Sequence, residues 1–149
     1  MSIVNQINAD IKSAMLAKER EKLDSLRAIK AALLLAGTEK GANGEVNDTT
    51  ATMTIQKLVK QREDSAKIYT EQNREDLAEI EISQSAFMKP YLPKQLTNDE
   101  IKNKLKEIIS TLGANGPSDF GKVMGMASKQ LAGKADGGTI SKVLKEMLQ

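Results

Sequence analysis

Cationic and anionic side chains are concentrated in the middle of the chain, where they could bind a charged ligand or take part in proton transfer. Carboxylates coupled to cations across two helices have perturbed pKa values, which are frequent at functional sites. Ion pairing between the two helices explains the same pattern without any function. We favour structural pairing and keep a binding or catalytic role as the alternative. The predicted pairing joins Lys57, Lys60, Gln61, Arg62, Glu63 and Asp64 with Asp76, Glu79 and Glu81 of the next helix. The catalytic alternative rests on Lys57, Arg62, Asp76 and Glu81.

A second group of residues that could bind a ligand lies near the C-terminus. At about 100° per residue, Lys122, Gly125 and Lys129 fall on one side of a helix, opposite its apolar residues, and Lys134 follows in a glycine-rich turn. Lysine ammonium groups bind phosphates as point charges. Aromatic side chains are scarce, so little base readout is expected. These four residues therefore predict contact with the phosphates of a folded RNA.

The glycines of this region have structural explanations as well. A glycine inside a helix costs about 1 kcal/mol relative to alanine, and is usually tolerated where something approaches the backbone closely. For Gly121 we expect another helix, whereas for Gly125 an external partner is an equal alternative. The turn from Gly133 to Gly138 can hold an anion with its backbone amides or simply connect two helices. It is not a P-loop, because the required glycine spacing is absent.

The composition excludes the commonest enzyme chemistries. The 149 residues include no Cys and no His, so a disulfide framework, a zinc site of the usual ligands and a Cys or His catalytic centre are excluded. The sequence has no run of 18 apolar residues and no secretory signal at its start. We therefore expect no metal, no cofactor, no membrane insertion and a cytosolic location.

Two prolines divide the chain. Pro90 and Pro93 each lack an amide donor and force the preceding residue towards extended geometry, so no helix can continue through them. Residues 1–93 carry 13 Lys/Arg and 14 Asp/Glu, whereas residues 94–149 carry 9 and 6, so the positive charge lies in the C-terminal part. We predict an N-terminal helical domain over residues 1–93 and a C-terminal domain over residues 94–149.

Apolar residues recur at helical spacing in every long segment, which predicts an all-α fold. The clearest helix start is at Thr97, which has the spacing of a capping box with Glu100. In the segment from residue 74 to residue 89, the expected core stripe runs through Leu77, Ile80, Gln84, Phe87 and Met88.

Motifs spread over the whole chain resemble those of the YqeY family. The chain departs from the family pattern at Gln84 and Ser85, where Glu and Ile are expected. The resemblance implies a two-part all-helical fold, with a four-helix N-terminal portion joined to a small three-helix C-terminal bundle. The motifs are Ala14-Met15, Leu26-Arg27, Lys57 with Lys60-Gln61-Arg62, Ser65, Tyr69, Arg74 with Asp76-Leu77-Ala78, Tyr91-Leu92-Pro93, Asp119 with Gly121-Lys122-Val123-Met124, and Gly133-Lys134-Ala135-Asp136-Gly137.

YqeY proteins are similar to the tail of the B subunit of the bacterial glutamyl/aspartyl-tRNA amidotransferase, which contacts the elbow of the tRNA. The resemblance implies an accessory tRNA-binding protein, with tRNA and an aminoacyl-tRNA-related enzyme as partners. No independent catalysis is expected, because the catalytic parts of the amidotransferase lie outside the shared region. Two alternatives remain open. One is a component of a glutamine-dependent amidotransferase, a carbon-nitrogen ligase, and the other is a helical protein-interaction module whose seven Met residues suit adaptable contacts.

Overall fold

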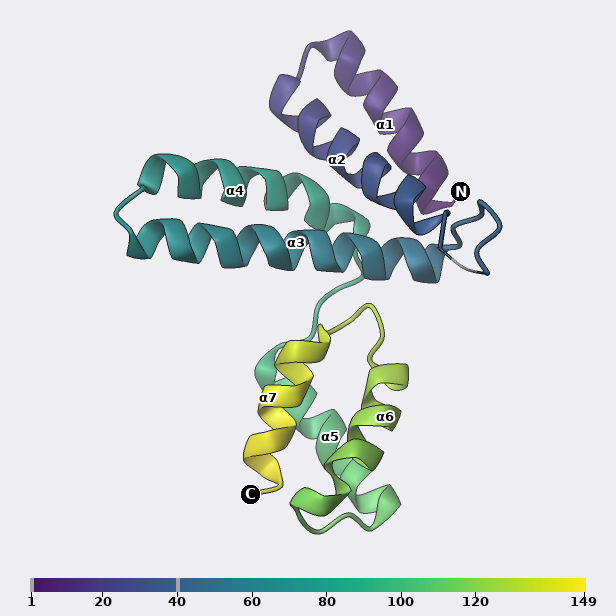
Figure 1. Ribbon diagram of the computed structural model, residues 1–149, viewed down its shortest axis with the longest axis vertical. Helices are drawn as coiled ribbons and strands as arrows, with labels where there is room; N and C mark the ends of the chain where they lie inside the picture. The colour runs from purple at the N-terminus through teal and green to yellow at the C-terminus, as the bar shows by residue number, and fades with distance from the viewer. Residues whose placement is uncertain (1, 40) are drawn as a thin grey trace. The chain divides into compact units, whose positions relative to one another are not determined.

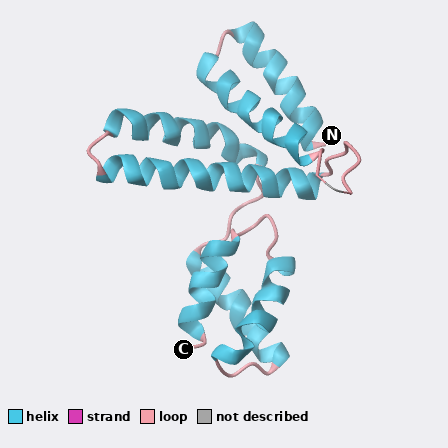
Figure 2. Cartoon of the chain, in the orientation of Figure 1, coloured by secondary structure: helices cyan, strands magenta, loops and turns pink. Residues whose placement is uncertain are grey.

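The computed structural model describes residues 2–39 and 41–149. Within these ranges the chain forms helices joined by loops and contains no strand, which confirms the all-α prediction (Figure 2). The chain separates into two compact units. The first ends at Leu92, and the second runs from Pro93 to Gln149.

The first unit is built from two helical hairpins (Figure 1). Helices α1 (Ile3–Ala17) and α2 (Arg20–Ala36) form one hairpin, and α3 (Asp48–Glu71) and α4 (Glu75–Met88) form the other. The backbone N–H of Ile3 donates to the Asp48 carboxylate at 2.9 Å, which ties the start of α1 to the start of α3. A short 3₁₀ helix, η1 (Lys89–Tyr91), follows α4.

Helix α4 buries only part of the predicted stripe. Met88 is buried as predicted, and Leu77, Gln84 and Phe87 are half-buried. The prediction for Ile80 is wrong, because Ile80 is 53% exposed and Ala78 and Ser85 are buried instead. The physical reason is that α4 packs against both α2 and α3. Small side chains at Ala78 and Ser85 allow this close approach, and the Ser85 hydroxyl donates to the carbonyl of Ile82 at 2.8 Å, so its burial leaves no unpaired donor.

The helical part of the first unit ends at the two prolines, as predicted. Helix α4 stops at Met88, Pro90 lies in η1, and Leu92 is extended with ψ at 148°. The core that these elements enclose consists of Ile7, Ala14, Leu26, Ile29, Leu33, Ala51, Ile55, Val59 and Met88.

The second unit contains α5 (Asn98–Leu112), the 3₁₀ helix η2 (Pro117–Asp119), α6 (Phe120–Gln130) and α7 (Gly137–Met147). The capping box is present: the Thr97 hydroxyl accepts from the N–H of Glu100, whose carboxylate accepts from the N–H of Thr97. No helix within residues 2–39 and 41–149 is long and apolar enough to cross a bilayer. The core of this unit consists of Ile101, Leu105, Ile108, Val123, Ala127, Leu131, Ala135, Ile140, Leu144 and Leu148.

Candidate nucleic-acid interface

Helix α6 places three of the predicted RNA-binding residues on one exposed face. Val123 and Ala127 are fully buried against α5 and α7, which fixes the rotation of the helix about its axis. Lys122, Gly125 and Lys129 are all exposed, and the helical period places them together on the opposite side. We call this side the α6 face.

The two glycines of α6 border open space. A Cβ atom built on Gly121 or on Gly125 meets no heavy atom within 4 Å outside the helix. The expectation that Gly121 packs against another helix is therefore wrong, because Gly121 lies on the exposed side of α6 rather than on its buried side. Both glycines lower the helix propensity of α6 without improving its packing.

Lys134 lies in the turn between α6 and α7 and has an exposed side chain. Its backbone carbonyl accepts from the N–H of Leu96 at 2.9 Å, so the turn is tied to the segment that enters α5. The N-terminus of α7 is capped by Asp136, whose carboxylate accepts from the N–H of Thr139 at 3.0 Å. The carboxylate of Asp136 thus already lies at the positive N-terminal end of α7. This favours the interpretation that the turn simply connects two helices over the interpretation that it binds an anion.

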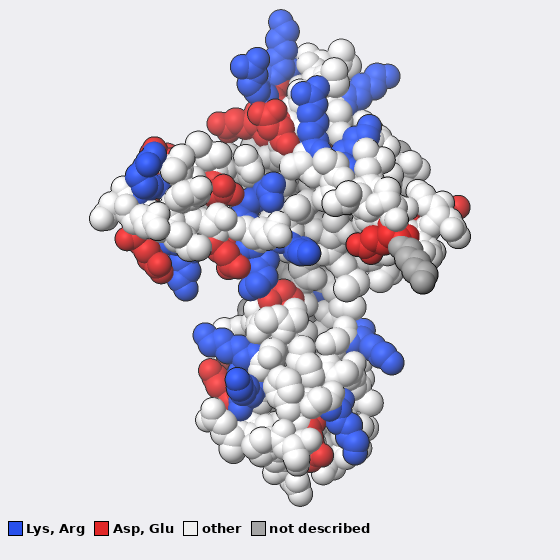
Figure 3. All heavy atoms as spheres, viewed as in Figure 1, with Lys and Arg blue, Asp and Glu red and all other residues white. Residues whose placement is uncertain are grey.

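The charges of the second unit are distributed unequally between exposed and half-buried positions. All nine lysines from Lys94 to Lys145 are exposed. Three of the six carboxylates, those of Glu100, Asp119 and Asp136, are half-buried and accept hydrogen bonds from backbone N–H groups near helix starts. On the side that Figure 3 shows, the lysines lie on both flanks of the unit and do not merge into one patch. The α6 face is therefore a local group of cations.

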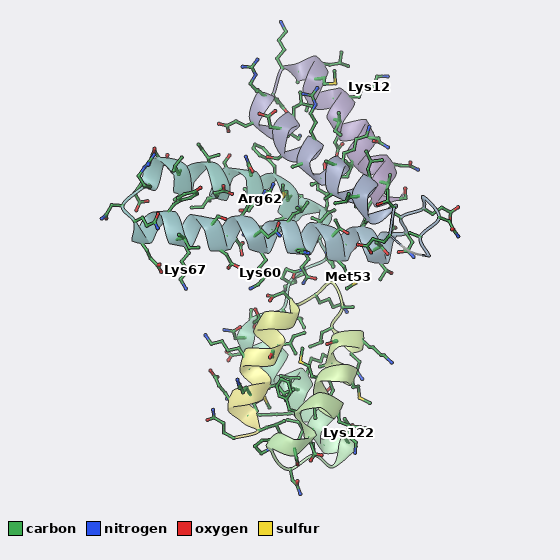
Figure 4. All side chains as sticks on the ribbon, viewed as in Figure 1. Lys12, Met53, Lys60, Arg62, Lys67 and Lys122 are labelled. Carbon is green, nitrogen blue, oxygen red and sulfur yellow. The ribbon has the colours of Figure 1, made fainter. Side chains whose placement is uncertain are left out.

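Only part of the central charged group faces α4. Figure 4 shows Lys60 and Lys67 on the side of α3 that points away from α4, whereas Arg62 lies between the two helices. Lys57, Lys60 and Gln61 are exposed, and the helical period places them on that outer side. The buried residues Ala51, Ile55, Val59 and Ala66 set the rotation of α3. This rotation turns Lys57, Lys60 and Gln61 away from α4 and Arg62 towards it (Figure 4). Glu63 of the same helix pairs with Lys89 of η1, with Oε1 2.7 Å from Nζ.

The charged residues at the start of α4 pair locally. Arg74 and Asp76 pair with each other across two residues, with Nη2 3.1 Å from Oδ2. The guanidinium of Arg74 lowers the pKa of Asp76, mainly through their hydrogen bond. Glu81 is half-buried on the inner side of α4. Arg74, Asp76 and Glu81 therefore do not converge on one site with Arg62.

Sequence reasoning missed the contact between Tyr91 and α1 in the first unit. The hydroxyl of Tyr91 in η1 donates to the carboxylate of Asp10 in α1, across 81 residues of sequence. Burial and this hydrogen bond raise the pKa of Tyr91, so its hydroxyl keeps its proton to a higher pH than that of an exposed tyrosine. The Tyr-Leu-Pro motif marked Tyr91 in the sequence, but nothing in the sequence indicated that Asp10 would be its hydrogen-bond partner. Within residues 2–39 and 41–149, no cluster of acidic residues has the arrangement to hold a metal ion.

Comparison with known proteins gives consistent matches over nearly the whole chain. A family model described as Yqey-like protein matches residues 4–148. A relative from Clavispora lusitaniae is 29% identical over an alignment of 150 residues, covering 99% of this chain and 85% of that protein. A relative from Pyrenophora tritici-repentis is 30% identical and covers 98% of this chain and 81% of that protein. A relative from Meyerozyma guilliermondii is 30% identical, covering 85% of this chain and 67% of that protein.

These three relatives carry the same name, Altered inheritance of mitochondria protein 41, mitochondrial. The name contradicts the cytosolic location predicted from the sequence, and that prediction is wrong. It rested on the absence of a secretory signal and of a long apolar run. Neither feature distinguishes the cytosol from the interior of an organelle.

Proposed function

Because this chain belongs to the YqeY family, we propose that it is an accessory tRNA-binding protein. The proposal assigns RNA contact to the three-helix C-terminal portion, residues 94–149. It assigns no catalytic activity to the chain. The similarity of YqeY proteins to the amidotransferase tail supports tRNA as the class of RNA.

The open space beside Gly125 on the α6 face carries the proposal. Gly125 lies between two exposed lysines, and nothing in the protein fills the space beside it. A sugar-phosphate backbone can approach the helix closely there, while Lys122 and Lys129 meet the phosphates. Lys134 extends the same contact into the following turn. Glycine at this position is disfavoured for the helix alone, so a close external contact accounts for it better than helix stability does.

The affinity that such a face can supply is small and strongly dependent on salt. Three or four lysine–phosphate contacts predict a slope of log K against log salt of roughly −2 to −4. Lysines act as point charges, so base sequence should matter little. Binding to total tRNA should therefore be detectable at low ionic strength and should weaken steeply as salt is added.

The test is a titration of the full chain against total tRNA at two ionic strengths. Mitochondrial tRNA is included, because the relatives are named as mitochondrial proteins. The double variant Lys122→Glu/Lys129→Glu should lose about tenfold or more in affinity and show a shallower salt slope. The matched control is Lys102→Glu/Lys142→Glu, which makes the same charge change at exposed lysines of α5 and α7. Equal losses in both double variants would contradict the α6 face.

Exposed apolar side chains in the first unit support a second candidate function, that of a protein-interaction module. Exposed large apolar side chains mark protein contact sites when they lie close together. Affinity capture that recovers one protein and no RNA would favour this function over tRNA binding. The exposed large apolar residues among those described all precede Pro93, and they are Met15, Leu16, Leu34, Leu35, Met53, Ile68, Ile80 and Ile82.

A further inference from the structure

A cavity of about 440 Å³, open to solvent, lies on the surface of the first unit where α1, α2, the end of α4 and η1 meet. Its volume falls at the lower end of the range found for small-molecule sites. Polar groups from three different elements reach it: Gln6 and Asp10 from α1, Lys22 from α2 and Tyr91 from η1. Apolar groups come from α4 and η1. The cavity thus combines opposite charges with an apolar wall.

The anionic side of this cavity is held in place by a hydrogen bond. Tyr91 donates its hydroxyl to Oδ2 of Asp10, and both side chains are half-buried. A carboxylate has about four acceptor positions, so the hydrogen bond from Tyr91 leaves Asp10 able to accept from a ligand. The hydroxyl oxygen of Tyr91 can itself accept a further hydrogen bond. This pair is therefore suited to bind a cationic donor group.

The cationic side is formed by Lys22. Its Nζ atom lies 3.6 Å from the carboxylate of Glu19, a loose contact between side chains that are 41% and 51% exposed. An ammonium group has three donors, so this contact leaves Lys22 able to bind another carboxylate. Lys22 is half-buried and lines the cavity, whereas Glu19 and Glu21 are exposed.

The remaining wall is apolar and comes from the end of α4 and from η1. Ala86, Phe87 and Pro90 line it, beside the ring of Tyr91. An aromatic ring and a proline ring provide a flat surface for an aliphatic or aromatic group. A ligand with two opposite charges and an apolar side chain would therefore find a partner for each of its parts.

We infer that this cavity binds a small zwitterion of the class of free α-amino acids. The ammonium group of the ligand contacts Asp10 and Tyr91, its carboxylate contacts Lys22, and its side chain lies against Phe87 and Pro90. The site lies wholly in the first unit and uses no residue of the α6 face. It is therefore independent of tRNA binding.

The test uses the full ¹⁵N-labelled chain and nuclear magnetic resonance. Each of the common L-α-amino acids is added to about 10 mM, and the amide signals of Ala86, Phe87 and Tyr91 are followed. At least one amino acid should shift these signals in a saturable way, with a Kd of about 1 mM or tighter. Its N-acetyl derivative and its decarboxylated amine, which each lack one charge, should bind about fivefold more weakly.

Matched variants distinguish the site from general charge effects. Asp10→Asn keeps an acceptor for Tyr91 but removes the negative charge, and Lys22→Gln removes the positive charge. Each should weaken binding about fivefold. Lys12→Gln makes the same change as Lys22→Gln at an exposed position of α1 and should leave binding unchanged (Figure 4). The inference is overturned if no amino acid shifts the three signals, or if Asp10→Asn and Lys22→Gln bind as tightly as Lys12→Gln.

Discussion

Arg62 on α3 donates a hydrogen bond from Nε to the side-chain oxygen of Gln84 on α4, at 3.2 Å. Its Nη1 donates to the carbonyl of Leu58, one turn earlier on α3, at 3.3 Å. Arg62 is half-buried between the two helices. A guanidinium is thus held at the α3–α4 contact by neutral acceptors. Hydrogen bonds of this kind are weaker than those made to a carboxylate.

Replacing Gln84 with Glu should stabilise the first unit. The new carboxylate would accept from Arg62 in nearly the same geometry, and the hydrogen bond would become charge-assisted at both ends. We expect the free energy of unfolding to rise by about 1 kcal/mol at low salt, measured by urea denaturation. The gain should shrink as salt is added, because the pair is only half-buried.

Gln61→Glu is the matched control for this prediction. It makes the same chemical change on the exposed side of α3, and should alter stability by no more than about 0.5 kcal/mol. Equal effects of the two substitutions would show that the Arg62 contact is not the cause.

Gly125→Ala should stabilise α6. The added methyl group meets no neighbour, so the substitution gains the helix propensity of alanine, about 1 kcal/mol, without a steric penalty. Urea denaturation measures the gain. Gly113→Ala is the contrasting variant, because Gly113 ends α5 with φ at +66° and an L side chain is strained there. The tRNA affinity of Gly125→Ala should fall although its stability rises, and unchanged affinity would argue against close approach of the RNA.

Tyr91→Phe should destabilise the first unit by about 1 to 2 kcal/mol, because the hydrogen bond to the Asp10 carboxylate is lost. The folded state raises the pKa of Tyr91 above the value of about 10 in an unfolded chain. The folded state therefore keeps a proton that the unfolded state loses, so this contribution is complete below pH 10 and declines above it. Urea denaturation from pH 8 to pH 11 should show a steeper loss of stability in the parent chain than in Tyr91→Phe.

Thr97→Ala should weaken the start of α5. The substitution removes the acceptor for the N–H of Glu100 and costs about 1 kcal/mol. Hydrogen exchange at the amides of Ile101 and Leu105 reports the free energy of opening of this helix. Thr111→Ala, at the other end of α5, is the control, since the exposed Thr111 hydroxyl only donates back to the carbonyl of Glu107. Similar exchange in the two variants would mean that the capping box contributes little.

Local features of the fold were predictable because each depends on residues only a few positions apart. The capping box at Thr97 needs only the side chain three residues later, and Pro90 stops a helix through its own ring. The buried stripe of α6 follows from the helical period alone. The rotation of α4 could not be predicted in this way, because its apolar and small residues are distributed around the helix, and its packing partners selected Ala78 and Ser85 over Ile80.

The sequence by itself determined that the chain is helical, that it breaks at Pro90 and Pro93, and that Lys122, Gly125 and Lys129 share a helix face. Only the tertiary structure decided which neighbours these local elements meet. It paired Tyr91 with Asp10 across 81 residues and left the space beside Gly121 open. The physical reason is range: caps, prolines and helical periodicity act within about one or two turns, whereas burial and hydrogen-bond partners depend on how separate helices pack.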